Sequence, residues 1–237
     1  HAMHDPRLDS DNSAAFNEFY PHLHGIREEV EYSEIQGIRL YHNRNTIHFP
    51  SHWHSAIEIL YPLEENYTVK IGTEENVLAP GDILVVAPGT IHSYTPPESG
   101  ERIFILFDYN LLKMFRGLRQ MMQAIQPYLL ITQTAYPPLN EKLQELLRDV
   151  IREYDEDVPY CGAMIWSRLL EFFAYIGRTD VYRVSHSREF PKDKRQEYVT
   201  KFMEVCNYIT DHLDEEINTD RLAEIAGFSK FHFSRLF

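Results

Sequence analysis

The sequence predicts an α+β protein in which a small β-barrel or sandwich with a helical hairpin is followed by part of an all-helical domain. Short apolar runs of strand length follow one another from residue 38 to about residue 108, and the apolar period then changes from two to about 3.6. A polar stretch separates a last helical pattern from the rest. We therefore place one domain at residues 1–177, a linker at 178–196 and a second domain at 197–237.

The composition is that of a packed, soluble chain. Of the 237 residues, 43% are hydrophobic and 13% aromatic, which suffices for two apolar cores. A net charge of −13 argues against a general binder of nucleic acid or of an anionic membrane, so any DNA contact must be local. The two cysteines lack metal-site spacing, and the sequence has neither a signal peptide nor a transmembrane run. These features predict a cytoplasmic protein.

Five runs have the composition of strands and are bounded by turn residues such as Pro80-Gly81 and Pro88-Gly89. They are Ile38–His42, Ala56–Tyr61, Tyr67–Ile71, Ile83–Ala87 and Ile103–Phe107. Strands this short and this regularly spaced indicate a barrel or a sandwich.

Two apolar stripes of helical period follow, within residues 110–177. The first contains Leu139, Leu143, Leu146, Leu147, Val150, Ile151 and Tyr154, and the second Ile165, Leu169, Phe172, Phe173 and Ile176. We expect these stripes to form a helical hairpin. A further helical pattern begins at Val199.

Two histidines and a glutamate occupy alternate positions early in the chain. His52, His54 and Glu58 have the same parity, so their side chains share one face on an unbulged strand. His92, just after the Pro88-Gly89 turn, can join them from a neighbouring strand. Three imidazoles and a carboxylate suit Zn²⁺, Ni²⁺, Fe²⁺ or Mn²⁺. These four residues are therefore candidate metal ligands and candidate effector-binding residues.

The same residues resemble the cupin superfamily. Its first motif carries His-x-His followed shortly by Glu, and its second carries Pro-x-Gly-x-x-His or a close variant. Here the second motif, Pro88-Gly89-Thr90-Ile91-His92, is one residue tighter. The glycine that usually follows the first motif is not evident, because Pro62-Leu63-Glu64-Glu65-Asn66 occupies that region. The resemblance implies a cupin-like barrel with a metal at the four residues.

The cluster can alternatively bind a ligand without a metal. A His-x-His pair on a strand can line a polar pocket that binds a sugar or an acid directly. Tyr94 is expected to add aromatic surface to the pocket. Trp53 and Tyr61 have the opposite parity to the histidines and are expected to pack outside.

The C-terminal residues have the pattern of two short helices joined by a tight turn. Thr219 is the expected N-cap of the first helix, Gly227 supplies the turn and Ser229 caps the second helix. The expected inward residues are Leu222, Ala223, Ile225, Ala226, Phe228, Phe233, Leu236 and Phe237. The residues expected to contact DNA are Ser229, Lys230, Phe231, His232, Ser234 and Arg235.

Residues 222–237 resemble the helix-turn-helix of AraC-type transcription regulators. The shared series is Leu-Ala, a small residue, Gly, a hydrophobe and Ser, and then Phe-Ser-Arg-Leu-Phe. The resemblance implies two such units joined by a long helix, whereas this sequence ends inside the second helix of the first unit. Residues 218–237 carry three basic against two acidic side chains. We therefore expect the 237 residues to bind operator DNA weakly and the complete protein to bind it tightly.

Together these features predict a ligand-responsive, sequence-specific DNA-binding transcription regulator and not an enzyme. A small-molecule effector such as a sugar or a sugar acid, or a divalent metal, would bind in the barrel and change the arrangement of a homodimer. The AraC resemblance places the dimer contact in the helical hairpin, although the stripe at Leu139–Tyr154 can also dock on the barrel. The alternative is a metal-dependent cupin enzyme, an isomerase or oxygenase. Such an enzyme has no need of residues 222–237.

Overall fold

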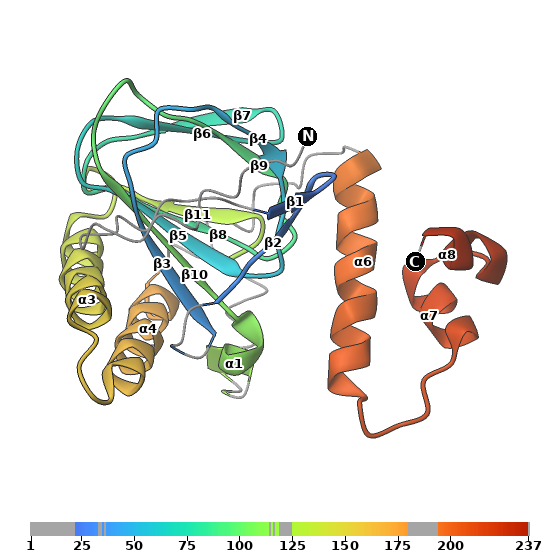
Figure 1. Cartoon of the computed structure of the whole chain (residues 1–237). Coiled ribbons are helices and arrows are strands. Elements are labelled where there is room, and N and C mark those ends of the chain that lie inside the picture. Colours follow the sequence, from blue (N-terminus) through green and yellow to red (C-terminus); the bar gives the residue numbers. More distant parts are fainter. Residues whose placement is uncertain are drawn as a thin grey trace, which may run out of the picture.

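The computed structural model describes residues 22–32, 35, 37–113, 115, 117–118, 125–179 and 194–236 (Figure 1). The strands are β1 (His22–His24), β2 (Arg27–Glu29), β3 (Ile38–Asn43), β4 (Phe49–His52), β5 (Ile57–Pro62), β6 (Tyr67–Ile71), β7 (Glu74–Leu78), β8 (Ile83–Val86), β9 (His92–Thr95), β10 (Arg102–Phe107) and β11 (Tyr128–Ile131). The helices are α1 (Tyr109–Lys113), α3 (Pro137–Glu156), α4 (Cys161–Gly177), α6 (Lys194–Asp211), α7 (Thr219–Ala226) and α8 (Lys230–Leu236).

Two antiparallel sheets face each other and enclose the interior of the barrel (Figure 1). One sheet has the strand order β11-β8-β5-β10-β3 and the other the order β4-β9-β6-β7. Apolar and aromatic side chains pack together between the sheets, among them Leu60, Val69 and Phe104. The predicted α+β class is therefore confirmed, and the functional cluster described below lies inside this barrel.

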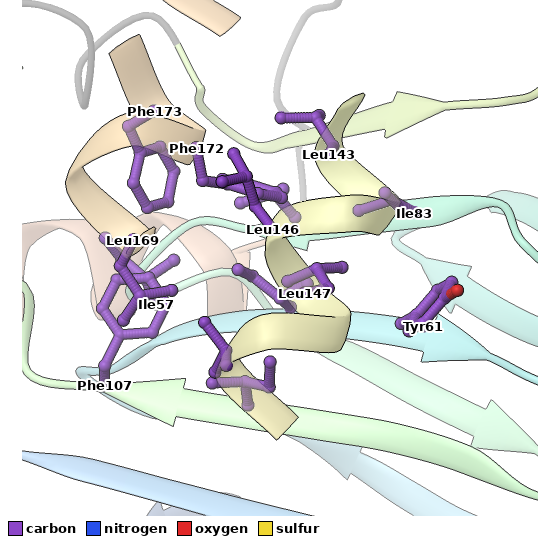
Figure 2. Close-up of a cluster of buried hydrophobic side chains, with 14 of the residues drawn as sticks. Ile57, Tyr61, Ile83, Phe107, Leu143, Leu146, Leu147, Leu169, Phe172 and Phe173 are labelled. Atoms are coloured by element: carbon purple, nitrogen blue, oxygen red, sulfur yellow. The ribbon is translucent and has the colours of Figure 1, made fainter. Parts of the chain in front are cut away.

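The helical hairpin covers the outer face of the five-stranded sheet (Figure 1). Figure 2 shows Leu143, Leu146 and Leu147 of α3 and Phe172 and Phe173 of α4 directed at that sheet. Both predicted stripes are thus present, and they dock on the barrel within one chain. Because β5 and β10 are covered on both faces, all of their residues are buried, and this explains their continuous apolar runs.

All five predicted strands are present, but six others among the described residues are not among the predictions. The segments of β4, β7 and β9 contain proline, histidine and acidic residues in place of the β-branched runs that identify a strand. The prediction of helices throughout residues 110–177 is wrong for Tyr128–Ile131. These four residues are too few for a helix, and they pair with β8 at the edge of the five-stranded sheet as β11.

Helix α6 begins at Lys194, inside the linker predicted at 178–196, and most of that linker lies outside the described residues. Helices α7 and α8 pack on α6 around Val205, Ala223, Ala226 and Phe233. Of the helices that the structure describes, none combines the length and the apolar character that crossing a membrane requires.

A histidine links the barrel to helix α3. On β3, His42 places Nδ1 2.8 Å from Glu101 Oε1 and Nε2 2.9 Å from Asp155 Oδ1 on α3. Burial lowers the pKa of His42, but the hydrogen bonds to the two carboxylates outweigh this effect and raise the pKa above 6.5. Protonated His42 therefore stabilises the fold below about pH 6.5, and this stabilisation is lost as the pH rises through the higher folded-state pKa.

We predict that a change from about pH 5.5 to about pH 8.5 weakens the wild type more than the His42→Gln variant. The difference in the free energy of unfolding should be at most about 1 kcal/mol, because water screens these partly exposed groups. Urea denaturation at both pH values measures it, with His48→Gln, a change of an exposed histidine, as the control. An equal pH dependence of His42→Gln and the wild type would show that the link contributes nothing.

Candidate functional site

Three histidines from three segments bring their rings together inside the barrel. His52 ends β4, His54 lies in the bend before β5, and His92 begins β9. Each is at most 1% exposed. Each histidine offers one ring nitrogen as a ligand, and these three nitrogens all lie within 4.8 Å of one another. The ring centroids of His52 and His92 are 4.2 Å apart. The three histidines singled out in the sequence are therefore close enough to share one ion.

The parity of the sequence predicted that the cluster forms on one face of a single strand. The structure differs. The chain leaves β4 at His52 and enters β5 at Ile57, so His52 belongs to the four-stranded sheet and Glu58 to the five-stranded sheet. The two residues meet because the sheets face each other. His92 stands directly opposite His52 in the register of β4 and β9.

Each imidazole is oriented by a backbone carbonyl. In His52, the Nδ1 atom lies 2.9 Å from Pro50 O. The corresponding distance is 3.1 Å to Ala56 O in His54 and 2.8 Å to Thr90 O in His92. Because a carbonyl oxygen only accepts, Nδ1 must carry the proton and donate it, which leaves Nε2 of a neutral ring with its lone pair free. Metal-binding histidines are commonly fixed by such a hydrogen bond.

Glu58 is fully buried and has a partner on each carboxylate oxygen. His54 Nε2 donates to Oε2 at 3.0 Å, and the Tyr94 hydroxyl donates to Oε1. Burial alone would raise the pKa of Glu58, but the hydrogen bond from His54 and the nearby imidazoles lower it overall. Glu58 in turn raises the pKa of His54 against the effect of burial. His54 and Glu58 therefore form a buried ion pair.

The other two histidines remain neutral. Burial, followed by the proximity of His92 and His54, lowers the pKa of His52 well below its usual value. Burial also lowers the pKa of His92 to about 4, although the charge of Glu58 opposes this effect. A neutral imidazole is the form that binds a metal ion, so both rings already have the required protonation state.

A second buried carboxylate, Glu28, is absent from the sequence prediction. It lies on β2, is 4% exposed, and places Oε2 3.3 Å from His52 Nε2. Burial raises the pKa of Glu28 to about 7, with His54 lowering it and Glu58 raising it to smaller degrees. The charged run from Arg27 to Glu29 gave no indication of burial, because such a run is usually a solvated segment.

Three polar atoms of this cluster have no hydrogen-bond partner among the described residues: Glu28 Oε2, His52 Nε2 and His92 Nε2. A buried polar atom without a partner costs free energy. Imidazole nitrogen and carboxylate oxygen are the donor types of Zn²⁺, Fe²⁺, Mn²⁺ and Ni²⁺ sites. The residues of the cluster therefore fit a divalent transition metal.

The remaining residues near the cluster lie as follows. Tyr94 is buried inside the barrel, with its hydroxyl on Glu58, whereas Trp53 faces the opposite way. The Trp53 ring packs against Phe202 of α6 with centroids 5.6 Å apart. Tyr61 packs in the outer core beneath α3 and donates to Gln144 Oε1 at 3.0 Å.

Helices α7 and α8 form the two-helix unit that the sequence predicted. Gly227 between them has a φ of 66°, in the left-handed region that glycine adopts readily. The predicted cap on α8 is present, since Ser229 Oγ accepts from the amide of His232 at 3.2 Å.

The N-cap of α7 differs from the prediction. Asn218, not Thr219, caps the helix, because its Oδ1 accepts from the amide of Arg221 at 2.8 Å. Thr219 is instead the first residue of α7. Asparagine is at least as good a cap as threonine, so the sequence alone did not separate the two positions.

Five of the six residues predicted to contact DNA are exposed: Ser229, Lys230, Phe231, Ser234 and Arg235. His232 is only half-exposed, and its ring packs against Phe228 with centroids 4.8 Å apart. It therefore points partly inward, contrary to the prediction. Leu236 and Phe237, predicted to face inward, have side chains outside the described residues.

The family of the barrel follows from comparison with known proteins. The profile of the AraC-like ligand-binding domain family matches residues 36–173, which include the barrel strands from β3 onward and the α3–α4 hairpin. The chain belongs to this family. In AraC-like terms, residues 36–173 are the ligand-binding domain, and α6, α7 and α8 lie after it. No curated protein matches the sequence.

Solved structures give distant similarity to this AraC-like chain. The AraC-like transcriptional activator CuxR is 12% identical over 75% of this chain, with a TM-score of 0.47, and the chain spans 58% of its length. Fatty-acid-bound ToxT from Vibrio cholerae is 11% identical, covers 84% of this chain and 89% of its own, and has a TM-score of 0.43. An RmlC-like cupin from Shewanella frigidimarina is 20% identical over 30% of this chain and 67% of its own, with a TM-score of 0.29.

Proposed function

We propose that this AraC-like chain is a ligand-responsive, sequence-specific DNA-binding transcription regulator. The barrel holds the effector, and α7 and α8 contact DNA. The observation that carries this proposal is the position of α6, which packs against the barrel on one side and against α7 and α8 on the other (Figure 1).

On the barrel side, Gln196 clamps α6 to the loop that leads to His92. Its side chain is 4% exposed; Nε2 donates to Gly89 O at 2.7 Å and Oε1 accepts from the amide of Ile91 at 2.9 Å. The contact is close, since a Cβ at Gly89 would lie 2.8 Å from Met203 Cγ. A shift of His92 on binding a ligand would therefore be transmitted to α6.

On its other side, α6 holds the two-helix unit. Val205 lies in the small core with Ala223, Ala226 and Phe233, and the Tyr198 ring stacks on Phe228 with centroids 5.7 Å apart. Because α6 is shared between the two contacts, a change in its position relative to the barrel moves α7 and α8 with it. This supports a coupling between effector binding and DNA binding.

A cavity suited to a small effector lies beside Gln196, between the barrel and α6. It has a volume of about 340 Å³, and its lining includes Lys70 and Ser93 of the barrel and Arg195 and Gln196 of α6. This volume is at the lower end of small-molecule sites. The basic side chains favour an anionic ligand such as a sugar acid, which would contact the barrel and α6 together.

The second effector that we propose is a divalent transition metal at His52, His54, His92 and Glu58. It would satisfy the unpartnered nitrogens and join segments from both sheets. An ion that binds only the folded state also stabilises it.

We also propose a homodimer through the helical hairpin, but not through the stripe at Leu139–Tyr154. Leu143 and Val150 are at most 1% exposed and pack on the barrel. The contact must instead use hairpin residues that remain exposed, such as Tyr160 at 86% and Met164 at 40%.

The metal-dependent cupin enzyme is the weaker alternative, because an enzyme has no need of α7 and α8.

The proposed DNA contact can be tested by selection from a random duplex pool at low salt, where weak binding is retained. We predict that the wild type enriches one sequence motif, and that Arg235→Ala weakens binding to it by about tenfold, since a base contact contributes about 1–3 kcal/mol. The control is Arg221→Ala, an exposed arginine on α7 that pairs with Glu224. No enriched motif, or equal losses in the two variants, would contradict the proposal.

The proposed metal can be tested by elemental analysis of tag-free protein purified without a nickel column. We predict about one equivalent of a transition metal in the wild type and in His48→Ala, and a loss of most of it in His92→Ala. Circular dichroism would verify that both variants fold. A wild-type content below about a tenth of an equivalent, after exposure to Zn²⁺, would rule the metal out.

A further inference from the structure

The N-terminal hairpin β1–β2 lies against the bend that carries His54. The amide of Glu28 donates to Trp53 O at 2.8 Å, and the amide of Trp53 donates to Ile26 O at 2.9 Å. These two hydrogen bonds fix the backbone of Glu28 beside the residue between His52 and His54. The position of Glu28 at the cluster is therefore determined by main-chain pairing and not by a flexible loop.

One carboxylate oxygen of Glu28, Oε2, enters the cluster without a hydrogen-bond partner among the described residues. Its Oε2 lies 3.3 Å from His52 Nε2, and neither atom makes a hydrogen bond among the described residues. When Glu28 is ionised, both atoms only accept and gain nothing from this approach, because Nδ1 of His52 already carries the ring proton. A cation between or beside them would satisfy both.

Glu28 differs in this respect from Glu58, the carboxylate that the sequence suggested. Both oxygens of Glu58 already accept hydrogen bonds, from His54 and Tyr94. Glu28 Oε2 and the Nε2 atoms of His52 and His92 have no such bond to lose among the described residues. A metal ion therefore displaces no hydrogen bond when it binds these three atoms, whereas His54 Nε2 and Glu58 Oε2 join it only by giving up the hydrogen bond between them and releasing the His54 Nε2 proton.

We propose that Glu28 is a ligand of the metal bound by the three histidines, in addition to Glu58. This inference rests on the proposed metal site and adds the N-terminal hairpin to it. The hairpin also touches α6, since the Arg27 guanidinium lies 5.8 Å from the ring centroids of both Trp53 and Phe202. Metal binding would therefore fix the hairpin in the position where it supports α6.

Titration of the tag-free, metal-free chain with Co²⁺ tests this proposal, because the visible bands of Co²⁺ report the number and type of its ligands. We compare the wild type with Glu28→Gln, which keeps the size of the side chain but removes its charge. The matched control is Glu29→Gln, since Glu29 is the adjacent glutamate, is exposed and pairs with His24 at 3.3 Å. Glu28→Asp, which keeps the carboxylate on a shorter side chain, is the conservative variant.

The expected result is that Glu28→Gln binds Co²⁺ at least about tenfold more weakly and with an altered spectrum, whereas Glu29→Gln matches the wild type. Glu28→Asp should recover part of the affinity. Hydrogen exchange of residues 22–29 should slow when Co²⁺ binds the wild type and not when it binds Glu28→Gln. Thermal unfolding of the metal-free proteins should show that Glu28→Gln is at least as stable as the wild type, because a neutral amide costs less to bury than a carboxylate whose Oε2 has no hydrogen-bond partner among the described residues.

Three results would overturn the inference in separable ways. If the wild type binds Co²⁺ and Glu28→Gln binds it with the same affinity and spectrum, Glu28 is not a ligand, while the metal site stands. If the wild type and Glu29→Gln bind no Co²⁺, the proposed metal itself fails. A loss of fold in Glu28→Gln would make Glu28 a structural residue, provided that Glu28→Asp folds and binds Co²⁺ as tightly as the wild type.

Discussion

Three imidazoles and two carboxylates lie together between two apolar sheets, where each of their polar atoms needs a partner because water is excluded. The barrel meets this requirement with backbone carbonyls at every Nδ1 and with the paired side chains of His54, Glu58 and Tyr94. The Nε2 atoms of His52 and His92 and one oxygen of Glu28 are left over. These three atoms come from the end of β4, the start of β9 and the N-terminal hairpin, so a partner that they share would join the three segments.

The same segments form the surface on which α6 rests. Trp53, between two of the histidines, packs against Phe202, and the loop before His92 is held by Gln196. The cluster and the helix are thus separated by only one to three residues of backbone at each contact. Such short connections allow small movements of the cluster to bias the position of a helix, provided that the helix has two arrangements of similar free energy.

Sequence patterns predicted the parts of the fold in which neighbouring residues determine the structure. The run Ile83–Val86 and the stripes of α3 and α4 were identified because burial on a sheet or on one helix face leaves a periodic apolar signal. Strands β4 and β9 were missed because each is short, contains a histidine of the cluster and lacks a run of β-branched residues. His52, His54, Glu58 and His92 were found from residue type, although the geometry that joins them is different from the predicted strand face.

Glu28 and Gln196 could not be found in this way. Their burial depends on pairing with segments far away in the sequence, at Trp53 for Glu28 and at Gly89 for Gln196. Each stands among charged neighbours that are exposed, so the local sequence resembles a solvated surface. Polar residues that become buried only in the folded chain leave no periodic signal, and these two are the ones that connect the barrel to its surroundings.

The central claim is that the histidine cluster and α6 are coupled through the loop at residues 88–92. Hydrogen–deuterium exchange of the whole chain, with and without saturating Zn²⁺, tests it most directly. The account predicts that Zn²⁺ changes exchange in residues 88–92 and also in residues 194–211 of α6, and that Gln196→Leu abolishes the change in α6 while leaving Zn²⁺ binding intact. A Zn²⁺ effect confined to the barrel of the wild type, with none in α6, would contradict it.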